Sequence, residues 1–155
     1  MKNFIRFENV SYSYDDNEEE YGDGKSQTKT VGHVDYAVKK ADFSIEKGEF
    51  VAIVGRNGSG KSTLARTMNA LLLPTEGTVL VNGIDTQNDE LIWEIRSRVG
   101  MVFQNPDNQI VGTSVEEDVA FGLENIGVPR EKMLEKIDFA LETVKNKKER
   151  RTEPH

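Results

Sequence analysis

The run "FVAIVGRNGSGKSTLARTMNALLLP" (residues 50–74) decides the fold. It opens with an uninterrupted apolar stretch, Phe50 to Val54, which is typical of a strand buried on both faces. A glycine-rich turn follows, and after Lys61 the apolar residues recur at helical spacing until Pro74. We therefore predict a buried strand, a glycine loop and a helix that stops at Pro74, in that order.

The glycine loop fits a phosphate-binding pattern, in which a glycine, four residues and then Gly-Lys-Ser run from Gly55 to Ser62. Glycines let backbone N–H groups turn inward around an anion, and the helix that follows adds the positive end of its dipole. In this pattern the lysine reaches the β- and γ-phosphates and the serine hydroxyl ligates Mg²⁺, so we expect these roles for Lys61 and Ser62. The candidate nucleotide contacts are Gly55, Asn57, Gly58, Ser59, Gly60, Lys61, Ser62 and Thr63.

Composition limits the other sites that the chain can build. There is no cysteine and only two histidines, His33 and His155, which excludes Cys-based metal sites, disulfides and a multi-His site. The net charge of −7 argues against general binding to nucleic acid or anionic lipid. No apolar run approaches the roughly 18 residues of a membrane span, so we expect any membrane role to be peripheral.

The segments around the loop carry strand signals. Residues 3–14 alternate apolar and polar side chains, two strand runs flank the Lys47-Gly48 turn, and residues 77–83 form a strand that ends in an Asn-Gly turn. A short helix with Leu91, Ile92 and Ile95 precedes a strand over 99–103. Six acids within residues 15–23 predict a flexible acidic loop over 15–33, with a cation site as the alternative.

Beyond residue 103 the pattern becomes helical. Ser114 and Glu117 have capping-box spacing, and Pro129 stands where the first turn of a second helix begins. That helix has an apolar stripe made of Met133, Leu134, Ile137, Leu141 and Val144. Five basic residues between Lys145 and Arg151 predict a solvated, frayed end. We expect residues 1–103 to form a strand-rich core with the phosphate loop and 104–155 to begin a helical subdomain.

The whole span resembles the first half of an ABC-type ATPase. Residues 103–125, "FQNPDNQIVGTSVEEDVAFGLEN", are most similar to the ATPase subunits of energy-coupling factor (ECF) transporters, which include cobalt and vitamin uptake systems. The implied fold class is α/β: a P-loop NTPase of the ABC type with a mixed sheet, incomplete because its C-terminal half is absent. The implied cofactors are ATP and Mg²⁺.

The resemblance also assigns residues. Tyr14 matches the aromatic residue that stacks on the nucleotide base, although it and Tyr12 could be plain strand aromatics. Gln104 matches the glutamine that contacts Mg²⁺ and the attacking water, and is thus a catalytic candidate with Lys61. The surface near residues 105–110 matches the one that touches a coupling helix of the membrane subunit.

The implied partners are a second ATPase subunit, in a homo- or heterodimer, a transmembrane coupling subunit and a membrane protein that captures the substrate, with no nucleic acid. The implied location is the cytoplasmic face of the cell membrane. The family's Leu-Ser-Gly-Gly-Gln signature, Asp-Glu pair and switch histidine have no counterpart in the sequence. Because hydrolysis needs such groups, we expect the 155-residue chain alone to be inactive, with its surface from Val51 to Val54 uncovered and its fold marginal and aggregation-prone.

Three alternatives stay open. The chain could be a nucleotide-binding fragment without hydrolysis, either regulatory or non-functional. It could be a small P-loop kinase, but Arg96, Arg98, Arg150 and Arg151 lack the glycine context of a lid. The third alternative is a soluble ABC-type protein of DNA repair or translation. Such proteins carry a long insertion or a second cassette, and neither fits in 155 residues.

Overall fold

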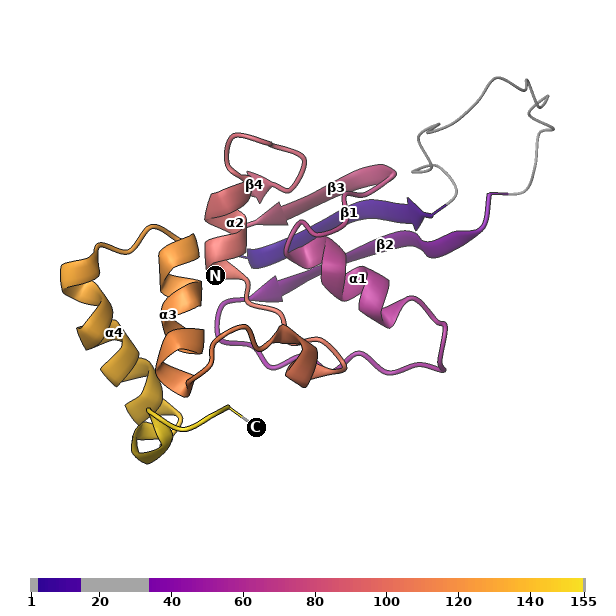
Figure 1. Cartoon of the computed structure of the whole chain (residues 1–155). Coiled ribbons are helices and arrows are strands. Elements are labelled where there is room, and N and C mark those ends of the chain that lie inside the picture. Colours follow the sequence, from indigo (N-terminus) through magenta and orange to yellow (C-terminus); the bar gives the residue numbers. More distant parts are fainter. Residues whose placement is uncertain (1–2, 15–33, 155) are drawn as a thin grey trace, which may run out of the picture. The chain divides into compact units, whose positions relative to one another are not determined.

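The computed structural model describes residues 3–14 and 34–154 (Figure 1). The described residues divide into two compact units, one up to residue 101 and one from residue 102, which are described one at a time. The acidic loop expected over residues 15–33 lies outside the described residues.

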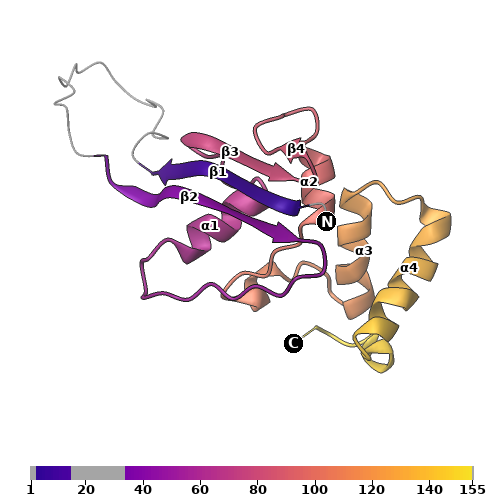
Figure 2. The ribbon, with the colours of Figure 1, turned by 180° about the vertical axis from the view of Figure 1, so that it is seen from behind.

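The first unit is built on a sheet with the strand order β2-β1-β3-β4. Its strands are β1 (Asn3–Ser13), β2 (Tyr36–Glu46), β3 (Glu76–Val81) and β4 (Ile84–Asp85), and all pairings among the described residues are antiparallel. Figure 2 shows β1 between β2 and β3, which explains why β1 is the most buried strand. A bulge at Asn9, whose φ is 50°, shifts the register, so that burial becomes continuous from Val10 to Ser13.

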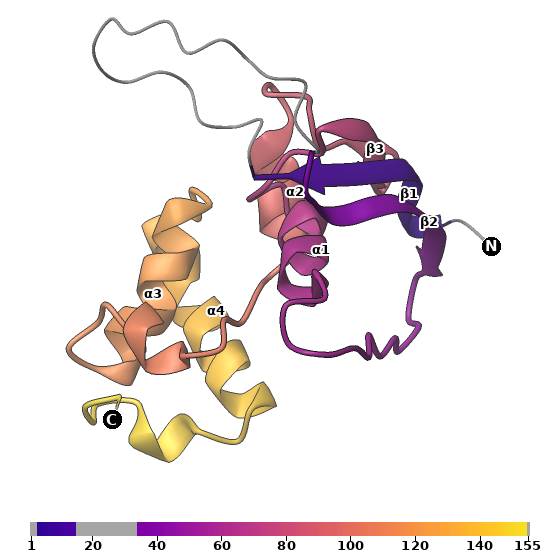
Figure 3. The ribbon, with the colours of Figure 1, turned by 90° about the vertical axis from the view of Figure 1, so that its right-hand side faces the viewer.

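Helix α1 (Lys61–Met68) packs on one face of this sheet (Figure 3). Its Leu64 and Met68 contact a core cluster that includes Phe7 and Val79. The helix begins at the predicted residue but ends well before Pro74. Its end comes early because Ala70 adopts a φ of 57° and the N–H groups of residues 71 and 72 both bond to the carbonyl of Arg66.

The remaining elements of this unit follow the sequence pattern. Asn82 and Gly83, with φ values of 50° and 85°, form the tight turn that joins β3 to β4, which confirms the predicted Asn-Gly turn. Helix α2 (Ile92–Arg98) buries Ile95 against Ala70 and Val81. This confirms the short helix expected there, with Ile92 and Ile95 on it, whereas Leu91 lies just before its first residue.

Two predicted strands are absent among the described residues. The runs 50–54 and 99–103 carry no strand pairing, and Phe50, Val54 and Val102 are 95%, 93% and 81% exposed. An apolar run becomes a buried strand only where neighbouring strands accept its hydrogen bonds and cover its faces, and the described residues provide neither. The exposure of residues 51–54 agrees with the uncovered surface that we expected.

The second unit holds η2 (Pro106–Gln109), α3 (Val115–Asn125), α4 (Arg130–Thr143) and η3 (Lys147–Glu149). The predicted cap of α3 is present, because Ser114 Oγ accepts a 3.3 Å hydrogen bond from the N–H of Glu117. The Glu117 carboxylate accepts one from the N–H of Thr113 at 3.1 Å.

Helix α4 packs beside α3 through a narrower stripe than predicted. Ile137 and Leu141 are buried, whereas Leu134 and Val144 are exposed, so their prediction as core residues is wrong. Pro129 is the residue before the helix, not part of its first turn. The two-helix unit thus buries only the centre of the α4 stripe.

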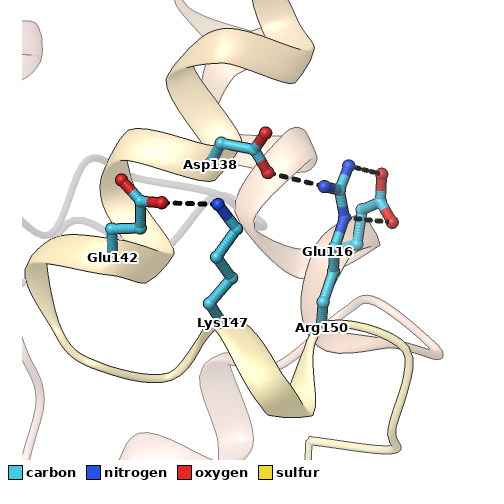
Figure 4. A network of polar contacts seen from close by, with 5 residues as sticks. All are labelled: Glu116, Asp138, Glu142, Lys147 and Arg150. Carbon is cyan, nitrogen blue, oxygen red and sulfur yellow. Dashed lines mark hydrogen bonds and ion pairs between the residues drawn. The ribbon is translucent and has the colours of Figure 1, made fainter.

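The C-terminal segment is ordered, which corrects the prediction of a frayed end. The N–H of Val115 donates to the carbonyl of Thr152 at 3.1 Å, and the N–H of Glu116 to that of Arg150 at 2.9 Å. The Arg150 side chain pairs with Glu116 on α3 and Asp138 on α4 (Figure 4). Composition alone suggested solvation because it does not show that Arg150 has two carboxylates within reach.

Candidate phosphate-binding site

The glycine loop is exposed and strongly turned. Gly58 and Gly60 have φ values of 80° and 83°, a region that favours glycine, and the N–H of Ser59 donates to the carbonyl of Arg56 at 3.2 Å. A Cβ at position 60 would overlap the carbonyl oxygen of Ala37 on β2. Gly60 is therefore required both by its backbone angle and by its close approach to the sheet edge.

Lys61 lies across this loop. Its Nζ donates hydrogen bonds to the carbonyls of Gly55 at 2.8 Å and Arg56 at 2.7 Å, and it lies 3.4 Å from Ser59 Oγ. These partners are neutral, and Lys61 forms no ion pair with a described residue. The ammonium group can thus exchange its carbonyl partners for phosphate oxygens without breaking an ion pair.

The N-terminus of α1 adds backbone donors beside the same loop. The hydrogen bond from the N–H of Leu64 to the carbonyl of Gly60, at 2.8 Å, is the first of the helix. The N–H groups of Lys61, Ser62 and Thr63 precede it, and such groups have no intrahelical acceptor. The first turn also carries no acidic side chain. The helix end therefore suits an anion.

The hydroxyl residues of the first turn differ in their surroundings. Ser62 is exposed, whereas Thr63 is buried and its Oγ1 lies 3.0 Å from the hydroxyl of Tyr14. The Ser62 hydroxyl fits the chemistry of Mg²⁺, which binds oxygen and takes few protein ligands beside phosphates and water. The contact between Thr63 and Tyr14 places the predicted base-stacking residue beside the loop, and sequence reasoning did not foresee it.

A cavity of about 230 Å³ opens between the loop, β2 and the exposed run 50–54. Its lining includes Lys39 and Lys61, apolar side chains such as Ile53 and Leu64, and no acidic side chain among the described residues. Although the whole chain has a net charge of −7, the lining of this cavity is positively charged and partly apolar. Lys39 was not among the predicted site residues, because an isolated lysine on a strand carries no sequence signal.

Gln104 belongs to the second unit, where it is exposed in the segment that precedes η2. Its contact with Mg²⁺ and the attacking water stays a prediction. Within residues 3–14 and 34–154, no group of three or more His, Cys, Asp or Glu side chains could hold a metal ion.

A family model described as "ABC transporter" matches residues 38–155. The chain belongs to the ABC transporter family. This assignment confirms the predicted α/β fold class and the resemblance on which it rests. In the part of this family member that the structure describes, no helix is long and apolar enough to cross a membrane.

Curated relatives of this ABC transporter family member include energy-coupling factor transporter ATP-binding proteins named EcfA1. The protein from Clostridium novyi is 49% identical over 99% of this chain and 50% of its own length. The protein from Enterococcus faecalis is 61% identical over 70% of this chain and 39% of its own. The chain thus spans about half the length of the curated relatives that it matches.

Solved structures show the same family likeness. The protein cbiO1 from Clostridium perfringens, described as part of the ABC transporter complex cbiONQ, matches with a TM-score of 0.77 and 29% identity. The match covers 99% of this chain and 55% of cbiO1. The ATP-binding cassette MJ0796, in a dimeric post-hydrolysis state bound to ADP and Pi, matches with a TM-score of 0.70 and 28% identity over 97% of this chain and 61% of its own.

Proposed function

We propose that this chain is the nucleotide-binding part of an ATPase subunit of an ECF-type transporter. The observation that carries the proposal is the phosphate loop, in which Lys61 and the start of α1 direct positive groups toward one exposed turn. The relatives named as energy-coupling factor ATP-binding proteins support the transport class. Hydrolysis of ATP that drives uptake of a vitamin or metal ion belongs to the whole protein.

The chain's own residues have separate tasks in this proposal. Backbone N–H groups from Gly55 to Thr63 bind the phosphates, Lys61 neutralises the β- and γ-phosphate charge, and Tyr14 stacks on the base. Bound Mg²⁺ would shield the charge that develops between the β- and γ-phosphates. Ser62 would hold the Mg²⁺ ion, and Gln104 is proposed as a further ligand on the family resemblance alone.

The proposed partners are a second ATPase subunit, a transmembrane coupling subunit and a substrate-capture membrane protein, at the cytoplasmic face of the membrane. The names of the relatives, an energy-coupling factor transporter and part of the complex cbiONQ, support this assembly. The proposed contact with the coupling subunit is the segment 105–110, in which residues 105–109 are exposed and Ile110 is partly buried. Co-purification of the full-length subunit with its membrane partners, with and without Asn105→Ala/Asp107→Ala, tests this surface. Unchanged co-purification of the double variant contradicts it.

The binding proposal is tested by titrating the 155-residue chain with a fluorescent ATP analogue and Mg²⁺. Lys61→Ala removes the proposed phosphate contact, and Lys47→Ala is the matched control, because it removes one exposed lysine from the turn after β2. Saturable binding that Lys61→Ala abolishes and Lys47→Ala leaves intact supports the proposal. Equal binding by all three proteins, or no binding, overturns it for this chain.

A further inference from the structure

A hydrogen bond joins the end of β1 to the first turn of α1. The hydroxyl of Tyr14, which directly follows β1, lies 3.0 Å from Thr63 Oγ1. Thr63 is only 6% exposed, so its hydroxyl has little access to water and depends on this protein partner. The bond spans 49 residues of sequence and is therefore a tertiary contact of the folded chain.

A second contact fixes the same aromatic ring. The rings of Tyr12 and Tyr14 meet edge to face, with centroids 4.9 Å apart and planes at 84°. Tyr12 is buried in the strand, so it offers a rigid support, and edge-to-face pairs add to stability beyond their buried area. Tyr14 itself remains 49% exposed. Thr63 thus holds the Tyr14 hydroxyl and Tyr12 holds its ring, while about half of the side chain faces solvent.

We propose that Thr63 is a positioning residue for Tyr14, so that base and phosphates meet a single preformed site. This inference rests on the proposed function and deepens it. The two hydroxyl residues of the first turn then have different tasks: Ser62 is exposed for the metal and phosphates, whereas Thr63 holds the aromatic platform beside the loop. A platform that is already fixed loses little side-chain freedom when a base stacks on it.

If Thr63 positions Tyr14, the hydrogen bond between their hydroxyls should strengthen binding of the base but not of the phosphates. The probes are MgATP and magnesium tripolyphosphate, which has three linked phosphates but neither the ribose nor the base. Tyr14→Phe keeps the ring and removes the hydroxyl, Thr63→Val removes the partner hydroxyl, and Thr63→Ser keeps it. Tyr36→Phe is the matched control, because it removes a tyrosine hydroxyl that bonds instead to Glu76 Oε1 at 3.0 Å.

Calorimetric titration of the 155-residue chain should show that Tyr14→Phe weakens MgATP binding about three- to tenfold, the size of one lost hydrogen bond, and leaves tripolyphosphate binding unchanged. Thr63→Val should weaken MgATP binding, Thr63→Ser should restore it, and the double variant should be no weaker than the weaker single variant. Tyr36→Phe should bind as the wild type does. Additive effects, an unchanged Tyr14→Phe, or equal losses for both probes overturn the inference.

Two comparisons separate this inference from the proposed function. If the wild-type chain shows no Lys61-dependent binding of MgATP, the proposed function fails and this inference fails with it. If that binding is present and Tyr14→Phe matches the wild type, only the inference fails. Urea unfolding without ligand gives a second double-mutant cycle. Tyr14→Phe and Thr63→Val should each lower the urea midpoint, and the double variant should lower it by less than the sum of the two. Independent shifts in that cycle contradict the hydrogen bond itself.

Discussion

Arg150 holds the carboxylate of Glu116 through two hydrogen bonds, 2.7 Å from Nε to Oε2 and 2.5 Å from Nη2 to Oε1 (Figure 4). Its third nitrogen, Nη1, donates to Asp138 Oδ1 at 2.6 Å. One guanidinium therefore joins the C-terminal segment to both α3 and α4. Because the planar fork of arginine matches a carboxylate in this way, a lysine at the same position could not reproduce the arrangement.

Replacement of Arg150 should loosen the second unit. We expect Arg150→Ala to lower the thermal midpoint of the chain and to increase hydrogen exchange at the N–H groups of Val115 and Glu116, whose acceptors lie at residues 152 and 150. Arg150→Lys should recover only part of the loss. Arg151→Ala, which removes a neighbouring exposed arginine, is the control and should change both measurements much less, because Arg151 acts on Glu116 through its charge alone. An Arg150→Ala variant that behaves like this control contradicts the clamp.

The same pair makes stability depend on acid pH. Hydrogen bonding from Arg150 lowers the pKa of Glu116 below its ordinary value of 4.5, so folding favours the ionised carboxylate. The stability that this carboxylate contributes is present above pH 4.5 and is lost as the pH falls through that value toward the lower pKa of the folded state.

Glu116→Gln should therefore be less stable than the wild type at pH 7, with a difference that shrinks as the pH falls through and below 4.5. Urea midpoints at a series of pH values measure this difference. A gap that stays constant from neutral to acid pH would mean that the charge of Glu116 contributes nothing.

The exposed apolar run at residues 50–54 should make the isolated chain bind hydrophobic dyes. Because Phe50 and Val54 are almost fully exposed, we expect Phe50→Ser and Val54→Thr to reduce dye fluorescence and self-association. Their free energies of unfolding should change by less than about 0.5 kcal/mol, as for surface sites. Val79→Thr, at a fully buried position, is the contrasting control and should cost about 1–3 kcal/mol. A loss of that size in Phe50→Ser would show that the run is buried in solution.

Gly60 should tolerate alanine far less than Gly48 does. Both have positive φ values, 83° and 86°, so alanine costs each about 1–2 kcal/mol of backbone strain. Only at Gly60 would the added Cβ also overlap the Ala37 carbonyl oxygen, whereas nothing lies within 4 Å at Gly48. Unfolding measurements on Gly60→Ala and Gly48→Ala should differ accordingly, with nucleotide binding lost only in Gly60→Ala. Equal losses of stability in the two variants would refute the close approach.

Local sequence signals predicted the elements that depend on nearby residues. The start of α1 at Lys61, the Asn82-Gly83 turn and the Ser114 cap are set by contacts within a few positions, and all three are present. The predicted strand at residues 50–54 depended on partner strands, which a hydrophobic pattern cannot supply. The bond between Tyr14 and Thr63 joins residues far apart in sequence, so spacing alone could not reveal it. The role of Gln104 likewise depends on groups far from it in sequence, so it remains a prediction.

The most direct test of the central claim is amide chemical-shift mapping of the ¹⁵N-labelled chain during titration with MgATP. Saturable shifts are expected at residues 55–63 and at Tyr14, and they should disappear in Lys61→Ala. Absence of shifts in the wild type, or shifts at the loop that persist unchanged in Lys61→Ala, would contradict the claim that this loop is a nucleotide-binding site centred on Lys61.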